Sequence, residues 1–274
     1  MFNEMLENIK KTHPLVHCIT NYVTVNDCAN ILIACGGSPI MSDDTGEVEE
    51  ITSICGGLDL NIGTLNKNTI PSMFLAGKRS NALGHPVILD PVGAGASNLR
   101  TETAQKLLDE VKFTAIRGNI SEIKALSQGK GTTRGVDADV ADTVTDETLE
   151  GAVAFAKAFS KKTGAVIAIT GAIDIVADEK NAYIIRNGNS MLAQITGSGC
   201  MLTAMTGAYL VANPGRVLEA TAAAVCAMGL CGELAFERLE KIGGGNSTYR
   251  NYLIDAVYSL DGETLMRGAK YEIK

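Results

Sequence analysis

The 274-residue sequence has few basic residues for its size: 24 lysines and arginines stand against 31 aspartates and glutamates, for a formal net charge of −7 at pH 7. A surface devoted to nucleic acid or to an anionic membrane would be repelled at long range by this balance. We therefore expect neither partner. To bind an anionic small molecule, the protein would need local hydrogen-bond donors or positive charge, from backbone N–H groups, an arginine or a metal ion.

The seven cysteines include no C-x-x-C pair of the kind that begins a zinc or redox site. They are odd in number and scattered, which fits reduced thiols in a cytoplasm. Segment 1–11 is unlike a signal peptide, because it carries Glu4 and Glu7 where a basic patch and an apolar run are needed. Positions 187–215 hold no charge, yet polar residues interrupt the roughly 20 apolar residues that a membrane span requires. The sequence predicts a cytoplasmic protein outside the membrane.

Both common phosphate-binding motifs are missing as well. No G-x-x-x-x-G-K-[ST] occurs, and Gly197-Ser198-Gly199 lacks the third spaced glycine of a dinucleotide fingerprint. The sequence has instead Thr196-Gly197-Ser198-Gly199-Cys200, followed by a small and apolar stretch that predicts a helix. Glycines let a turn aim its N–H groups inward, and the next helix adds the positive end of its dipole. This turn is the strongest candidate for binding an anion.

Two other interpretations of the turn stay open at the level of the residues. The pattern is also typical of a plain tight turn before a buried helix. Cys200 at a helix start is a candidate thiolate nucleophile, because a helix N-terminus lowers the pKa of a thiol. A cysteine hydrolase needs a base, however, and all three histidines lie in the first third of the chain. His17 falls within a predicted strand, where a hydrogen-bonded core residue is more typical than a catalyst.

Short apolar runs alternate with helical patterns along the chain, and several runs lack in/out alternation, as strands covered on both faces do. The predicted strands are Leu15–Ile19, Leu58–Ile62, Val87–Leu89, Phe113–Ile116 and Val166–Ile169, and the predicted helices between them are Asn26–Cys35, Val48–Cys55, Thr69–Ala82, Glu102–Val111, Ser121–Ser127 and Glu147–Lys161. The alternation predicts an α/β fold: a mostly parallel sheet with helices on both faces, as a single domain over residues 1–274.

The last third of the chain changes character. Asp174–Ala177 and Asn181–Arg186 predict a short hairpin. Helices are predicted over Met201–Val211, Val217–Glu240 and Thr248–Tyr258. The segment Gln128–Thr145, rich in glycine, threonine and aspartate, is the candidate for a mobile surface loop.

Ligands of open parallel sheets bind outside the carboxyl ends of the strands. The runs that follow the five predicted strands are Thr20-Asn21, Gly63-Thr64, Asp90-Pro91-Val92-Gly93, Arg117-Gly118-Asn119 and Thr170-Gly171. Each run alone is ordinary turn chemistry. Five polar or small runs on one rim predict a site there.

Glu122 follows Asn119 by three residues, the spacing of a helix cap whose glutamate complements the helix dipole. Beside Arg117 and Asp90 it has a second candidate role. Two carboxylates near an anion-binding turn, without a cluster of histidine or cysteine ligands, suit Mg²⁺ held partly through water by phosphates.

Taken in order, six motifs resemble those of the hydroxyethylthiazole kinase family from about residue 10 to residue 260. They are Pro14-Leu-Val-His-Cys-Ile-Thr-Asn21, Ser38-Pro-Ile-Met41, Asn61-Ile-Gly-Thr64, Asp90-Pro-Val-Gly-Ala94, Arg117-Gly-Asn-Ile-Ser-Glu122 and Thr196-Gly-Ser-Gly-Cys200. The resemblance implies a ribokinase-like fold and a homotrimer with active sites between subunits. It also implies transfer of the γ-phosphoryl group of ATP to the hydroxyl of 4-methyl-5-(2-hydroxyethyl)thiazole, in thiamine salvage.

The resemblance further implies roles for single residues. ATP would be bound by Arg117, Thr170, Asn119 and Gly171, the thiazole by Met41, Gly197, Asn21, Gly63 and Thr64, and Mg²⁺ by Asp90 and Glu122, with Gly197, Ser198, Gly199 and Cys200 as the catalytic turn. The wider superfamily commonly has an aspartate base after this turn, where this chain has Cys200. The identity of the base stays open, and Cys200 is expected mainly to position the substrate hydroxyl.

Three other functions are compatible with parts of the sequence, and each can be distinguished from a thiazole kinase by a different feature. A related kinase acting on hydroxymethylpyrimidine would share the phosphate machinery, although the substrate-side residues favour the thiazole. A nucleotide-binding regulator would keep the anion-binding turn but would have little reason to retain both Asp90 and Glu122. A cysteine hydrolase would be inactivated by thiol alkylation and would show no dependence on ATP.

Overall fold

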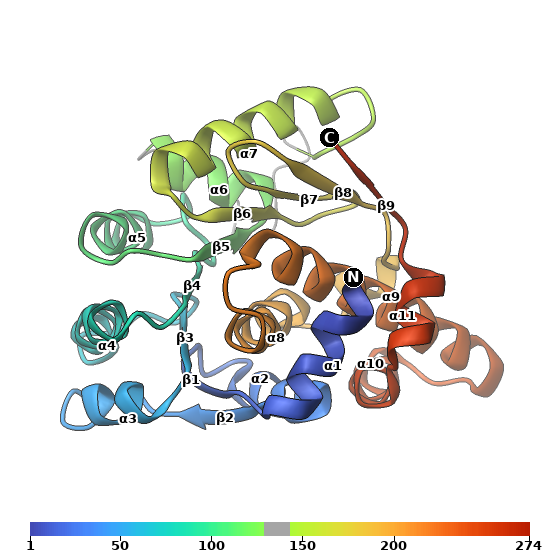
Figure 1. Cartoon of the computed structure of the whole chain (residues 1–274), viewed down its shortest axis with the longest axis horizontal. Helices are drawn as coiled ribbons and strands as arrows, with labels where there is room; N and C mark the ends of the chain where they lie inside the picture. Colours follow the sequence, from blue (N-terminus) through green and yellow to red (C-terminus); the bar gives the residue numbers. More distant parts are fainter. Residues whose placement is uncertain (129–142) are drawn as a thin grey trace.

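One nine-stranded sheet runs through the molecule (Figure 1), and the computed structural model describes residues 1–128 and 143–274 of the chain. The strand order is β2-β1-β3-β4-β5-β6-β7-β8-β9. β1 to β6 pair in parallel, and β7, β8 and β9 continue the sheet antiparallel. The strands are β1 Leu15–Ile19, β2 Ser38–Met41, β3 Gly57–Asn61, β4 Val87–Asp90, β5 Ala115–Gly118, β6 Val166–Ile169, β7 Asp174–Ala177, β8 Ala182–Ile185 and β9 Tyr271–Ile273.

Helices cover both faces of the sheet, and each face has its own apolar core. One core packs α3 to α7 against the sheet, and the other packs α1, α2 and α8 to α11 against the opposite face (Figure 1). The helices are α1 Phe2–Thr12, α2 Val25–Cys35, α3 Val48–Ile54, α4 Thr69–Leu83, α5 Asn98–Glu110, α6 Ile120–Gln128, α7 Leu149–Thr163, α8 Ser198–Ala212, α9 Val217–Ile242, α10 Asn246–Ser259 and α11 Gly262–Gly268, with a 3₁₀ turn over Ser190–Gln194. The predicted α/β layering is confirmed.

Every predicted strand and helix has a counterpart, but some bounds were wrong. β5 begins at Ala115 and not at Phe113, because Phe113 is buried by its side chain before the backbone starts to pair. α5 begins at Asn98, four residues earlier than expected, where Ser97 Oγ accepts from the Arg100 N–H. β2 and β9 were not predicted as strands: β2 is half-exposed and contains a proline, and β9 is short and exposed.

Two expectations about single segments have different outcomes. His17 is a hydrogen-bonded core residue, as predicted: it is fully buried, with Nδ1 3.0 Å from Thr52 Oγ1 and Nε2 2.9 Å from the Ser42 carbonyl oxygen. The loop expected over Gln128–Thr145 falls mainly on residues 129–142, which lie outside the described residues. That expectation stays a prediction.

Helix α9 is long and apolar enough, by length and composition, to cross a membrane. Within the fold, 78% of its apolar window is buried. It packs against α8 and α10, so its apolar surface is covered by protein. The composition of α9 is therefore that of a central core helix.

Asp59 is an unusual member of the core beneath α8. It lies on β3 beside Cys18 of β1 and Ile88 of β4, and it is fully buried. Neither of its carboxyl oxygens has a hydrogen-bond partner among the described residues. Burial, and to a lesser extent the nearby Asp90, raise the pKa of Asp59 well above its ordinary value. Both effects favour the neutral form of the carboxyl.

This buried acid predicts a pH-dependent stability. Above the ordinary aspartate pKa the folded chain keeps a proton at Asp59 that the unfolded chain releases, so the free energy of unfolding falls as pH rises. We expect Asp59→Asn to melt a few degrees higher than the wild type at pH 8, with a smaller gain at pH 5. Asp109→Asn, at an exposed position of α5, is the control and should follow the wild type. An equal gain at both pH values would contradict this linkage.

Candidate active site

The predicted site residues do line one edge of the sheet, and the strand order arranges them in a row. Met41 ends β2, Asn21 follows β1, and Gly63 and Thr64 follow β3. Asp90 ends β4 in the middle of the row. Farther along, Arg117 lies on β5, and Thr170 follows β6. Met41 and Thr170 are five strand spacings apart, about 24 Å at roughly 4.8 Å per spacing.

The turn before α8 has the geometry of an anion site. Gly197 is the N-cap with φ 82°, a left-handed conformation that favours glycine, and a Cβ there would lie 2.3 Å from Thr24 Cγ2. Ser198 and Gly199 open a helix of 15 residues, so unpaired N–H groups and a positive dipole end gather at this point. The interpretation as an anion-binding turn is favoured over a plain tight turn, because Arg117 reaches the same place.

Arg117 brings a positive charge onto the start of α8. A Cβ at Gly199 would lie 2.3 Å from Arg117 Nη1, so the guanidinium occupies the space that any side chain would need. Arg117 Nη2 also donates to Thr170 Oγ1 at 2.5 Å, and Nη1 lies 3.5 Å from Asp90 Oδ2. The backbone at Gly171 donates to the buried Asp174 Oδ1 at 2.8 Å. Burial raises the pKa of Asp174 to about 7.

Asp90 is fully buried, and its two oxygens have different surroundings. Oδ2 accepts from Asn61 Nδ2 at 3.0 Å and from Thr203 Oγ1 at 2.8 Å, in addition to its ion pair with Arg117. Oδ1 is buried and has no hydrogen-bond partner among the described residues. Burial raises the pKa of Asp90, and Arg117, Thr203 and Asn61 work against this rise. Oδ2 is thus held by three groups, whereas Oδ1 is bare, that is, without a hydrogen-bond partner among the described residues.

Cys200 lies in the first turn of α8 at the substrate side of Asp90. Its Sγ accepts from Asn21 Nδ2 at 3.3 Å, and the residue is 8% exposed. Burial, followed by the charge of Asp90, raises the pKa of Cys200 to about 11. A thiol with this pKa is protonated near neutral pH, which argues against the alternative of a thiolate nucleophile at this helix N-terminus.

Glu122 has the capping role that its spacing indicates. Its Oε2 accepts from the Asn119 N–H at 2.9 Å while its own N–H donates to Asn119 Oδ1 at 2.8 Å, which is a capping box at the start of α6. Its Oε1 accepts from the Gly93 N–H at 2.8 Å. Burial raises the pKa of Glu122 to about 7, and the neighbouring Asp90 adds to the rise. Glu122 therefore holds together the loops after β4 and β5.

The residues expected to bind the thiazole form a connected group at the other end of the row. Gly63 N–H donates to Asn61 Oδ1 at 2.9 Å, and a Cβ at Gly63 would lie 3.0 Å from Asn21. Thr64 Oγ1 accepts from the Tyr22 N–H at 3.1 Å, which ties the loops after β1 and β3. Met41 lies on the outer strand, half-buried and paired with Cys18.

Sequence reasoning missed three residues of this rim. Thr203 was overlooked, because a threonine inside a predicted helix gives no signal by its residue type. Asn61 was part of a motif but had no role, and Asp174 was seen only as the start of a hairpin. The spacing of four residues between Gly199 and Thr203, which places both on one helix face, was the one available signal for Thr203.

The donor set fits a hard divalent cation held by few protein ligands. Asp90 Oδ1 offers a bare carboxyl oxygen, and each Glu122 oxygen keeps a lone pair beyond its single backbone partner. Among residues 1–128 and 143–274, no group of three or more His, Cys, Asp and Glu side chains converges. That pattern matches Mg²⁺, which retains several waters and completes its shell with phosphates.

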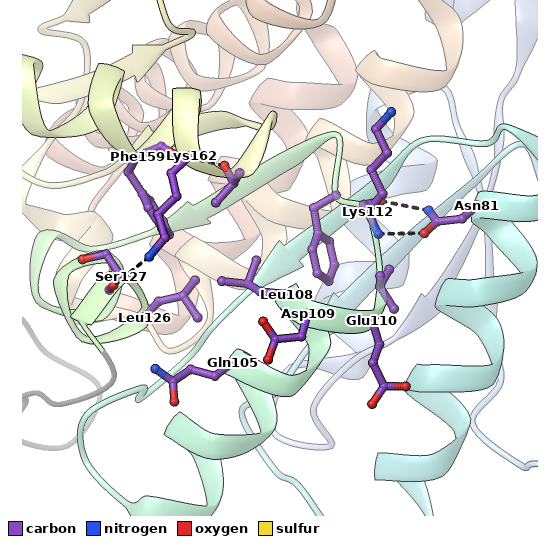
Figure 2. A pocket seen from close by; sticks show the side chains of 13 residues that line it. Asn81, Gln105, Leu108, Asp109, Glu110, Lys112, Leu126, Ser127, Phe159 and Lys162 are labelled. Atoms are coloured by element: carbon purple, nitrogen blue, oxygen red, sulfur yellow. Dashed lines mark hydrogen bonds between the residues drawn. The ribbon is translucent and has the colours of Figure 1, made fainter.

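A pocket of about 690 Å³ lies at the opposite edge of the sheet (Figure 2). It is lined by Asn81, Gln105, Leu108, Asp109, Glu110, Val111, Lys112, Phe113, Leu126, Ser127, Phe159, Lys162 and Thr163. The C-terminal ends of α4 to α7 gather there, and their partial negative charge disfavours phosphate. Lys162 Nζ donates to the Ser127 carbonyl oxygen at 3.4 Å (Figure 2). We place the site at the α8 edge, not here.

The fold and the rim together define an α/β kinase of the ribokinase-like class. The structure of the pyridoxal kinase from Staphylococcus aureus in complex with AMP-PCP matches with a TM-score of 0.60, over 95% of this chain and 97% of that chain, at 16% identity. At that identity the likeness concerns the fold. The structure of a hydroxyethylthiazole kinase protein from Pyrococcus horikoshii OT3 matches with a TM-score of 0.88 and 32% identity, over 100% of this chain and 98% of that chain.

The sequence comparison identifies the family within this class. The hydroxyethylthiazole kinase family matches residues 6–263. The hydroxyethylthiazole kinase of Clostridium acetobutylicum is 68% identical over 272 residues and covers 99% of each chain. That of Desulfovibrio desulfuricans is 50% identical, over 97% of this chain and 95% of the relative. The chain belongs to the hydroxyethylthiazole kinase family, as its ordered motifs predicted.

The contact between Gly199 and Arg117 predicts a defined loss of nucleotide binding. In Gly199→Ala the new methyl group must displace the guanidinium, a flexible tip, so folding should survive while Arg117 leaves the start of α8. We expect ADP to bind about tenfold more weakly by calorimetry, the loss of one charge-assisted contact. Gly151→Ala is the matched control, because that helical glycine faces open space. Unchanged ADP affinity in Gly199→Ala would refute the role of Arg117 at the start of α8 in nucleotide binding.

Proposed function

We propose that this chain transfers the γ-phosphoryl group of ATP to the hydroxyl of 4-methyl-5-(2-hydroxyethyl)thiazole, the reaction of a thiamine-salvage kinase. The observation that carries the proposal is the start of α8, where free N–H groups lie against the Arg117 guanidinium, which pairs with Asp90 Oδ2 at 3.5 Å, and where Cys200 is a buried thiol in the first turn. The relative with 68% identity bears the name of this kinase.

The order of the strands supports one arrangement of the two substrates along the rim, with ATP at one end of the row and the thiazole at the other. Arg117, Thr170, Asn119 and Gly171 lie at the β5–β6 end of the row and would bind ATP. The positive charge of Arg117 suits phosphates. The thiazole would bind at the β2–β1–β3 end, against Met41, Asn21, Gly63 and Thr64, with Gly197 beside it. The transferred group would then pass over the middle of the row, where Asp90 and Cys200 lie.

The reaction requires placement and charge stabilisation more than a strong base, since phosphoryl transfer passes through a loose transition state. The N–H groups of Gly197 to Cys200, with Ser198 and Gly199 between them, would stabilise the charge on the moving phosphoryl group. The Cys200 thiol, protonated at neutral pH, would position the substrate hydroxyl. Asp90 and Glu122 would hold Mg²⁺, which supplies neutralisation of the phosphate charge when bound.

Three further features of the protein belong to this proposal. A single domain is supported by one continuous sheet that extends from β2 to β9. A cytoplasmic location is supported by seven free cysteines, all buried. A homotrimer with intersubunit sites is supported by exposed apolar side chains beside the substrate end: Tyr22 is 77% exposed, Val23 56% and Leu99 53%.

A coupled ADP-release assay tests the activity. With MgATP, the thiazole alcohol should release ADP much faster than hydroxymethylpyrimidine does, and chelation of the metal should abolish the release. Cys200→Ala should keep activity within about tenfold of the wild type, whereas removal of a covalent nucleophile costs on the order of 10⁶. Release with neither alcohol would overturn the proposed function. A complete loss in Cys200→Ala would overturn the positioning role of the thiol.

Light scattering tests the trimer. The wild type should have a mass three times that of the 28.8-kDa chain. Val23→Asp places a charge among the exposed apolar side chains at the substrate end, and we expect both the mass and the ADP release to fall. Ile242→Asp changes an exposed apolar residue, 65% exposed, at the far end of α9 and serves as the control. A wild type with the mass of one chain would exclude intersubunit sites.

A further inference from the structure

Asn61 joins the two halves of the rim through a single carboxamide. Its Nδ2 donates to Asp90 Oδ2 at 3.0 Å, on the phosphate side. Its Oδ1 accepts from Asn21 Nδ2 at 3.0 Å, and that same amide nitrogen donates to Cys200 Sγ at 3.3 Å, on the alcohol side. Asn61 is 1% exposed, so water does not compete for these bonds.

Backbone donors fix the orientation of both amides. The Gly63 N–H donates to Asn61 Oδ1 at 2.9 Å, which leaves Nδ2 to face Asp90. The Thr24 N–H donates to Asn21 Oδ1 at 3.1 Å, which leaves Nδ2 to face Asn61 and Cys200. A backbone N–H only donates, so neither amide has an equivalent flipped arrangement. The hydrogen bonds between the Cys200 thiol and the Asp90 carboxyl therefore have a single arrangement: Asn21 Nδ2 donates to both Cys200 Sγ and Asn61 Oδ1, and Asn61 Nδ2 donates to Asp90 Oδ2.

We infer that Asn61 is a positioning residue for phosphoryl transfer, which holds the Asp90 carboxyl and the Asn21–Cys200 pair at a fixed separation so that phosphate and alcohol meet in line. The inference rests on the proposed function. Asn61 acts through its neighbours and not on the substrates. A misplacement of about 1 Å between reacting groups is enough to cost about 10²-fold in rate.

An asparagine is required at this position because one end must accept while the other end donates. An aspartate has the same shape and keeps the acceptor for Gly63 and Asn21, but it loses the amide donor toward Asp90. An alanine loses both ends. Thr203 supplies the second neutral donor to Asp90 Oδ2 from the opposite side, at 2.8 Å from α8, so it tests the Asp90 end independently.

The test compares kcat and KM across these variants in the ADP-release assay. Asn61→Asp should lower kcat about hundredfold, with the KM for the thiazole alcohol within about twofold, because the donor toward Asp90 Oδ2 is lost and a second carboxyl group takes its place 3.0 Å away. Asn61→Ala should lower kcat and also raise that KM about fivefold or more, because the Asn21 side is released too. Thr203→Val should lower kcat about tenfold with little change in KM, because only the hydrogen bond to Asp90 Oδ2 is lost, and Thr203→Ser should restore kcat to within about threefold of the wild type.

Thr206→Val is the matched control on the same helix. Thr206 is buried like Thr203, but its Oγ1 donates to the Leu202 carbonyl oxygen at 2.8 Å, and we expect wild-type kcat and KM. If Asn61 and Thr203 had a purely structural role, their variants would have lower melting temperatures. The different effects on kcat and KM would then be absent, and Thr203→Ser would not restore kcat. Wild-type kcat in both Asn61→Asp and Thr203→Val would overturn the inference alone. An inactive wild type would overturn the proposed function and the inference with it.

Discussion

The buried carboxyl of Asp90 is the constraint on which the rest of the rim depends. Removing a carboxylate from water costs several kcal/mol unless nearby groups compensate, and here the compensation comes from three different elements. Asn61 is supplied by β3, Arg117 by β5 and Thr203 by α8. These groups meet only when the parallel strands have their observed order and α8 lies across them. The contacts that compensate for the burial of the Asp90 carboxylate therefore also fix the start of α8 over the carboxyl edge of the sheet.

The surroundings of Asp90 also divide the rim by charge. On the β5–β6 side lies the Arg117 guanidinium, held by Thr170. On the β1–β3 side, Asn21 and Asn61 are amides, burial raises the pKa of Cys200 to about 11, and the Arg100 guanidinium donates through Nη2 to the Gly63 carbonyl oxygen at 2.8 Å. The guanidinium that lies against the start of α8 is that of Arg117, so a charged phosphate chain is favoured on the first side. The direction that we propose for the two substrates follows from this asymmetry.

Much of the fold could be predicted from the sequence, because its signals are local. Apolar runs without alternation indicated β1, β4 and β6, and the residues after the strands indicated the rim. The order of the strands is not local: nothing in the sequence of β2 places it at the outer edge beside β1, and its half-exposed residues carry no strand pattern. The roles of Asn61 and Thr203 depend on that order, since each acts on a residue of another element. Glu122 shows the opposite case, because its spacing from Asn119 alone predicted the cap.

Two buried aspartates of this sheet show that burial alone does not determine the role of a carboxyl group. Asp59 and Asp90 lie on neighbouring strands, and both are fully buried. Asp59 has no donor among the described residues, so burial raises its pKa well above the ordinary value and favours its neutral form. Asp90 has three donors on one oxygen, which oppose the rise in its pKa and leave the other oxygen bare. Only the second arrangement holds a carboxyl group in place through contacts from β3, β5 and α8. The chemistry of this edge therefore depends on Asn61, Arg117 and Thr203 as much as on the carboxyl that they surround.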